Sequence, residues 1–287
     1  MRRREPARLE LERAGRLGEV DLTRTLGPQV ALAVVIRVGT TVRPQHGDFA
    51  QMRETWLRAE DMGADTLFIW DHFFPLFGPA DGKHLECMTL LSAMAEATER
   101  VEFGALVLCN AYRNPNLVAD MTRTIDHISG GRHFLGIGSG WFKRDFDEYG
   151  YEFGTVGSRL RALDRSLPVI KDRLGELNPP PTRRIPILVA GVGEKVTLRI
   201  VAEHADIWHG IGDLETIRHK SAVLDEWCAK IGRNPGDIER STFVGDHLDL
   251  LDGYVDAGIT HLVVGAGGPE YDLEPLRKLV AWRDARA

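Results

Sequence analysis

Short apolar runs alternate with amphipathic stretches along most of the chain, from Gln29 onward. The runs are rich in Val, Ile, Leu and Phe, which suits strands that are buried on both faces, as in a parallel sheet. We therefore expect strands at 29–38, 66–70, 100–110, 133–140 (with its exit loop), 185–191, 205–210, 240–245 and 259–267.

The stretches between these runs place apolar residues three or four positions apart, which is typical of helices with one buried face. They predict helices at 48–62, 86–98, 115–128, 158–174, 194–203, 214–231 and 273–282, and one more that ends at Ala257. In two of these helices the expected buried faces are Phe49, Met52, Trp56 and Ala59, and Leu117, Met121, Ile125 and Ile128.

Eight strands that alternate with eight helices indicate an α/β protein of the (β/α)₈ TIM-barrel class. Alternation alone also fits a doubly wound open sheet. The segment 141–157 is aromatic, charged and long for a connection, so we expect an insertion after the fourth strand.

The first residues differ in composition from the rest of the chain. Residues 1–28 are rich in Arg and Glu and lack the apolar core of a secretory signal, so we expect an extension outside the core. Residues 29–287 would then form a single domain, because the alternation continues to the end without a second pattern.

Composition and charge narrow the classes of partner. The formal net charge of −6 argues against nucleic acid, which favours a basic face. No apolar run approaches the ~18 residues of a membrane span. Three widely spaced cysteines give neither a disulfide framework nor a zinc motif, and the histidines lack paired ligand spacing. We expect a cytoplasmic protein without a metal that acts on a small molecule.

Polar residues follow two of the predicted strands directly. Asp71 and His72 come after the second strand, at the end where parallel α/β folds collect their chemistry. One of them would orient a ligand and the other would move a proton; the alternative is a turn-capping acid and an ordinary polar histidine. Cys109, Asn110 and Arg113 follow the third strand, either facing a ligand or lying in a turn with Cys109 buried as a small apolar residue.

Two glycine-rich loops follow later strands, at 138–140 (GSG) and 191–194 (GVGE). Glycine allows close approach of the backbone to an anion, and a helix N-terminus offers free N–H groups, so the loops suit a phosphate group. Each loop alone is a weak signal, and neither is the full dinucleotide-binding fingerprint. Aromatic residues at several strand ends would suit a flat ligand.

Four stretches carry a family resemblance: ADTLFIWDHFFP at 64–75, residues 97–150 with the SGGR turn and LGIGSGW, IPILVAGVGEKVTLRIVAEHADIW at 185–208, and DAGITHLVVG at 256–265. With these motifs the chain resembles the luciferase-like monooxygenase family of flavin- and deazaflavin-dependent barrels. The resemblance implies a (β/α)₈ barrel, a lid-like insertion at 141–157 and a flavin-type ring across the mouth.

The resemblance also implies roles for individual residues. A non-prolyl cis peptide that backs the ring matches Leu106–Val107, and Cys109 follows on the same strand. Asp71 would lie near the ring and His72 near the reacting centre, as the catalytic pair. The phosphate-bearing tail would lie along the glycine loops, at Ser139, Gly140, Gly191, Gly193 and Glu194.

The function that follows is hydride transfer between coenzyme F420 and a small organic substrate. Where related sugar-phosphate dehydrogenases place a proton-donating Glu, this chain has Trp141, which argues for a more apolar substrate. A monooxygenase that uses reduced FMN and O₂ is the first alternative. A non-catalytic flavin-binding barrel is the second, and the family resemblance adds a possible homodimer.

Overall fold

The computed structural model describes residues 35–245 and 247–286. The expected extension at 1–28 and most of the expected strand at 29–38 lie outside these residues. The strand found at this end of the described chain covers Arg37–Val42, so it extends four residues beyond the predicted end at 38.

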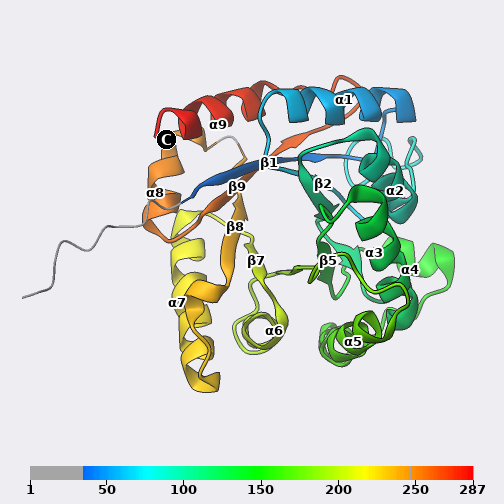
Figure 1. Ribbon diagram of the computed structural model, residues 1–287, viewed down its shortest axis with the longest axis vertical. Coiled ribbons are helices and arrows are strands. Elements are labelled where there is room, and N and C mark those ends of the chain that lie inside the picture. The colour runs from blue at the N-terminus through cyan, green and yellow to red at the C-terminus, as the bar shows by residue number, and fades with distance from the viewer. Residues whose placement is uncertain (1–34, 246, 287) are drawn as a thin grey trace, which may run out of the picture. The chain divides into compact units, whose positions relative to one another are not determined.

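Nine strands in the described part of the chain form one parallel sheet, which Figure 1 shows at the centre of a ring of helices. They are β1 (Arg37–Val42), β2 (Thr66–Ile69), β3 (Glu102–Ala105), β4 (Leu108–Cys109), β5 (Leu135–Gly138), β6 (Ile187–Ala190), β7 (Ile207–Gly210), β8 (Glu239–Phe243) and β9 (His261–Ala266). Their order is β3-β2-β1-β9-β8-β7-β6-β5-β4.

The two ends of this sheet meet. β3 and β4 are successive pieces of one stretch of chain, separated only by Leu106 and Val107. β4 pairs with β5, and a parallel bridge joins Phe103 of β3 to His133, just before β5. The sheet therefore closes into a barrel, which confirms the barrel prediction over the open doubly wound sheet.

The break between β3 and β4 is the one difference from the predicted count of eight strands. The Leu106–Val107 peptide bond is cis, as the family resemblance implied. Residues 100–110 thus run as two short strands in place of one, and both pair in the same sheet.

The helices lie close to their predicted positions. They are α1 (Phe49–Asp61), α2 (Cys87–Ala97), α3 (Pro115–Ser129), α4 (Lys143–Tyr149), α5 (Val156–Glu176), α6 (Thr197–His204), α7 (Leu214–Ile231), α8 (Leu251–Asp256) and α9 (Glu274–Asp284), with short 3₁₀ turns at Pro235–Asp237 and Leu248–Leu250. α1 begins where the Asp48 side chain accepts a hydrogen bond from the Gln51 N–H, and Pro115 occupies the first turn of α3.

The insertion after β5 contains a helix that the sequence analysis did not predict. α4 occupies 143–149 and ends at Gly150, whose φ of +73° is the left-handed conformation that glycine adopts readily. The insertion thus has a rigid element at the mouth of the barrel.

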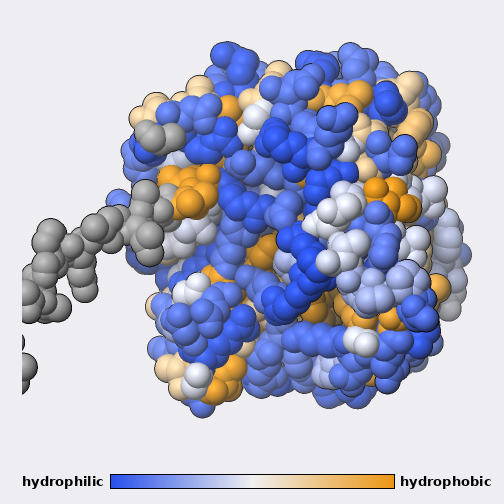
Figure 2. All heavy atoms as spheres, in the orientation of Figure 1, coloured by the Kyte–Doolittle hydropathy of each residue, from blue (hydrophilic) through white to orange (hydrophobic). Residues whose placement is uncertain are grey.

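Among residues 35–245 and 247–286, no helix is both long and apolar enough to cross a bilayer. On the face drawn in Figure 2, hydrophilic residues predominate and hydrophobic ones form small separate groups.

Candidate functional site

A cavity of about 460 Å³ opens at the carboxyl ends of the strands. Its walls come from β1, β2, the β3–β4 break, the exits of β5 and β6, and from β7 and β8. In a parallel barrel the carboxyl ends of all strands lie on the same side. Residues that are far apart in the sequence therefore converge there. Asp71, His72, Leu106, Val107, Cys109, Ser139, Gly140 and Gly191 all line this cavity.

Asp71 is a buried carboxylate that accepts hydrogen bonds from other residues of the barrel mouth. Arg113 donates to both of its oxygens, at 2.6 and 2.9 Å, and the Cys109 N–H donates at 2.9 Å. Arg113 also reaches Glu86 at 2.6 Å. Burial by itself lowers the pKa of Arg113, but the carboxylates of Asp71 and Glu86 raise this pKa above its ordinary value. Asp71 therefore fixes β4 against the exit of β2.

Arg113 is not the surface residue that one interpretation of the sequence suggested. Its side chain is only 11% exposed, because it lies between Asp71 and Glu86. The thiol of Cys109 is buried as well, and burial raises its pKa to about 12. Cys109 is therefore a neutral wall residue and no activated nucleophile.

His72 is held by a carboxylate from the insertion. Its Nδ1 lies 2.6 Å from Oδ2 of Asp145 in α4. Asp145 is fully buried and also accepts hydrogen bonds from the Tyr112 hydroxyl at 3.0 Å and the Phe73 N–H at 3.1 Å. Since carboxylates accept, Nδ1 carries the proton, and within residues 35–245 and 247–286 the other nitrogen, Nε2, has no hydrogen-bond partner.

Aromatic rings surround the His72 imidazole. Trp141 and Phe142 meet it edge-on, with ring centroids at 5.8 and 5.4 Å, and Trp70 lies 6.2 Å away. The Tyr112 hydroxyl beside it stays protonated, because burial and the nearby Cys109 and Asp145 raise its pKa. The arrangement presents one imidazole nitrogen in an otherwise apolar wall.

The glycine loops divide between two cavities. Ser139, Gly140 and Gly191 line the mouth, whereas Gly193 and Glu194 line a second cavity of about 380 Å³ that continues along the loop before α6. The Glu194 carboxylate is paired with Lys220 at 2.5 Å and His219 at 2.9 Å, and these cations lower its pKa.

The first of these loops passes so close to neighbouring residues that a side chain larger than that of glycine would collide with them. A Cβ on Gly140, whose φ is +79°, would overlap the Cys109 sulfur, and a Cβ on Gly138 would lie 2.7 Å from Val107. The backbone of β5 therefore approaches the β3–β4 break closely at Gly138, which adds no side chain to the cavity wall beside Val107.

Sequence reasoning missed Asp145, Tyr112, Arg43 and His209, all of which lie in or against the mouth cavity. Asp145 looked like one acid among several in a charged segment, and only its burial marks it. His209 lies in β7, with Nδ1 3.0 Å from the Ser241 hydroxyl, and burial together with His261 lowers its pKa to about 3. It is therefore neutral at ordinary pH.

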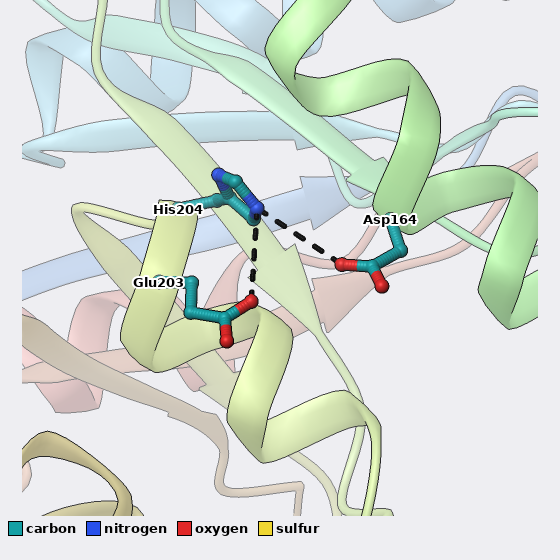
Figure 3. Close-up of side chains that lie close together, drawn as sticks. All are labelled: Asp164, Glu203 and His204. Atoms are coloured by element: carbon teal, nitrogen blue, oxygen red, sulfur yellow. Dashed lines mark ion pairs between the residues drawn. The ribbon is translucent and has the colours of Figure 1, made fainter. Parts of the chain in front are cut away.

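A group of possible metal ligands lies elsewhere, between α5 and α6: Asp164, Glu203 and His204 (Figure 3). Arg199 already binds both carboxylates, at 2.7 and 2.5 Å, and Lys171 lies 3.5 Å from His204. Burial and this lysine lower the pKa of His204. Because Arg199 and Lys171 already supply positive charge to these side chains, the group forms an ion-pair network and not a metal centre.

Comparison with known proteins agrees with the barrel fold. Residues 29–248 match the family model of the luciferase-like monooxygenases. An uncharacterized protein of Mycobacterium tuberculosis is 29% identical over 226 residues, covering 69% of this chain and 74% of that protein. The F420-dependent glucose-6-phosphate dehydrogenase of Amycolatopsis mediterranei is 30% identical over 140 residues, covering 48% of this chain and 41% of that enzyme.

A solved structure shares the fold. The F420-dependent secondary alcohol dehydrogenase in complex with an F420-acetone adduct has a TM-score of 0.76 at 15% identity, over 87% of this chain and 98% of that one. The chain belongs to the luciferase-like monooxygenase family. It is an oxidoreductase of this flavin- and F420-dependent family.

Proposed function

We propose that this protein is a coenzyme F420-dependent oxidoreductase that transfers a hydride between the deazaflavin and a small organic substrate. The observation that carries the proposal is the His72–Asp145 pair in the wall of the mouth cavity, in which Nδ1 is held and Nε2 has no hydrogen-bond partner among residues 35–245 and 247–286. The names of one relative and one structural neighbour support F420 as the cofactor.

The cavity fits a flat ring. The cis peptide Leu106–Val107 and Gly138, which has no side chain, would form its floor, and Asp71 holds this floor in place through the Cys109 N–H. The loops at Ser139, Gly140 and Gly191, and beyond them Gly193 and Glu194, would bind the phosphate-bearing tail.

When bound, F420 would supply the acceptor or donor of the hydride that the substrate exchanges. The residues of this chain manage the accompanying proton. As an alcohol loses its hydride, the hydroxyl proton passes to Nε2 of His72, and the imidazolium that forms is stabilised by the buried Asp145 carboxylate. The reverse reaction returns the same proton. The rings of Trp70, Trp141 and Phe142 lie against this imidazole, and the His72 side chain is 11% exposed.

A monooxygenase that uses reduced FMN and O₂ is the second candidate, which the family's own description favours. Tryptophan fluorescence separates the two, because Trp70 and Trp141 line the cavity. We expect F420 to quench this fluorescence at concentrations at least tenfold below those needed for FMN. The reverse order would favour the monooxygenase, and a cofactor that binds but is never reduced by any donor would favour a non-catalytic barrel.

The role of His72 is tested by replacement. A His72→Ala variant should lose roughly 10²- to 10⁴-fold in kcat, because the proton has no acceptor, while the Kd for F420 changes less than about threefold. His127→Ala on the exposed face of α3 is the matched control and should keep full activity. Unchanged kcat in the His72 variant would remove this residue from the mechanism.

The homodimer implied by the family resemblance stays a prediction. Sedimentation equilibrium of the full chain would test it.

A further inference from the structure

Arg43 is a cation at the mouth of the barrel that has no counter-charge among the described residues. It follows β1 directly and lines the same cavity as His72. Its guanidinium lies over two aromatic rings, 5.1 Å from the centroid of Phe77 and 6.0 Å from that of Trp70. Such contacts orient a guanidinium but leave its N–H donors unused.

No acid of residues 35–245 or 247–286 pairs with Arg43. Its side chain makes neither an ion pair nor a hydrogen bond there, although the structure gives ion pairs to most other arginines that are not fully exposed. Burial lowers the pKa of Arg43, and no carboxylate opposes this effect. A half-buried cation of this kind is costly unless a ligand supplies the missing charge.

The other titratable groups of the cavity do not offset this charge. Asp71 is neutralised by Arg113, and His209 is uncharged. His72 is bound to Asp145, which belongs to the adjoining insertion and is shared with Tyr112. Within the part of the chain that the structure describes, the cavity therefore carries a positive charge at Arg43 that no acid offsets, surrounded by aromatic and aliphatic side chains.

The chain also leaves space beside this guanidinium. A Cβ on Gly265 would lie 3.1 Å from one terminal nitrogen of Arg43, and a Cβ on Gly267 would lie 3.4 Å from the other. Neither glycine has a positive φ, so the backbone conformation does not demand glycine there. Glycine at both positions therefore keeps a further side chain from contacting either terminal nitrogen.

We propose that Arg43 binds the carboxylate of the substrate, and that the substrate class is a small monoanion with a flat apolar body. A single guanidinium matches one carboxylate in a two-pronged hydrogen bond, whereas a phosphate dianion would call for a second cation. The aromatic walls at Trp70, Phe77 and Trp141 would hold the apolar body. The inference rests on the proposed function, in which the substrate stacks on the cofactor ring.

Binding of matched probes tests the proposal by calorimetry, with the full-length protein alone and saturated with F420. Benzoate and benzamide have nearly the same shape but differ in charge. We expect benzoate to bind roughly 10- to 100-fold more tightly than benzamide, and this preference to fall as salt is added. Phenyl phosphate should bind no more tightly than benzoate.

Variants assign the preference to Arg43. Arg43→Gln should bind benzoate and benzamide equally, and Arg43→Lys should keep part of the preference. Arg218→Gln, an exposed change on α7 with the same loss of charge, should leave it unchanged. Unchanged benzamide affinity and circular dichroism show that Arg43→Gln is folded.

Several outcomes would overturn the proposal. In the wild type, these outcomes are equal affinity for benzoate and benzamide, no binding of either probe, or tighter binding of phenyl phosphate than of benzoate. In the variant, the outcome is a preference for benzoate over benzamide that survives in Arg43→Gln. If Arg43→Gln instead weakens F420 tenfold and keeps the benzoate preference, the anion belongs to the cofactor. Failure of the proposed function is distinct, because it appears as absent F420 binding while the probes still discriminate on the protein alone.

Discussion

The carboxylate of Asp145 receives three hydrogen bonds, and His72 supplies the shortest of them. We expect Asp145→Asn to lower kcat by about 10- to 100-fold, because the amide cannot stabilise a charged imidazole, while F420 affinity is kept. If Asp145 acts through His72, the double variant His72→Ala, Asp145→Asn should be no slower than His72→Ala alone.

The control for this variant lies on the same helix. Asp147→Asn removes an exposed acid that pairs with Lys143, and its kcat should equal that of the wild type. Additive losses in the double variant would mean that Asp145 acts independently of His72.

At this scale the sequence placed Asp71 and His72 at the mouth of the barrel but did not predict the side chains that they contact. Asp71 and His72 are adjacent in sequence, yet their side chains face different groups. Arg113 is 42 residues from Asp71, and Asp145 is 73 residues from His72. Only the closed barrel brings these groups together, so residue spacing along the chain carries no sign of either contact.

Among the secondary-structure elements, the contact between β3 and β5 depends on glycine. A Cβ on Gly136 would overlap the carbonyl oxygen of Ala105, a backbone atom that cannot move without breaking the sheet. Gly136→Ala should therefore lower the free energy of unfolding by roughly 3 kcal/mol or more, in the range of overpacked core sites. Urea denaturation followed by circular dichroism would measure this loss.

Gly175→Ala is the matched control. Gly175 lies in α5 with nothing within 4 Å of the added carbon, so alanine should stabilise the helix by about 0.5–1 kcal/mol. Equal effects of the two alanines would show that close approach of the strands is not what Gly136 provides.

The same scale shows where apolar periodicity succeeds and where it fails. α7 begins and ends as predicted, since its cap residue Asp213 and the closing Gly232 are both clear in the sequence. In α3 the expected face was right at Ile125, which is buried, and wrong at Leu117 and Ile128, which are exposed. Ala119 and Thr122 are buried as well, and hydrophobicity alone does not reveal a small residue or a hydroxyl on a buried face.

For the molecule as a whole, buried neutral histidines make stability depend on pH. His133 is fully buried at the start of β5, and burial lowers its pKa to about 4. Between pH 6.5 and 4 the unfolded chain takes up a proton that the folded chain refuses. The free energy of unfolding should therefore decrease as the pH falls through this window, by about 1.4 kcal/mol per pH unit for this group.

A His133→Leu variant should lose this part of the slope, as measured by urea denaturation at several pH values. His127→Leu, on the surface of α3, should keep the wild-type slope. An identical slope in both variants would place the origin of the acid sensitivity elsewhere, for example at His209, which titrates in the same direction.

The pairing of β4 with β5 offers a way to measure the fraction of correctly closed molecules in a preparation of this protein. That junction completes the barrel, and it also supplies Leu106, Val107 and Gly138 to the wall of the mouth cavity. A chain in which β4 is not paired with β5 lacks this wall. A cofactor ring that needs the wall would therefore bind only to molecules whose barrel is closed. The stoichiometry of F420 binding per chain would then serve as a gauge of the fraction of complete barrels in a sample, independent of any turnover.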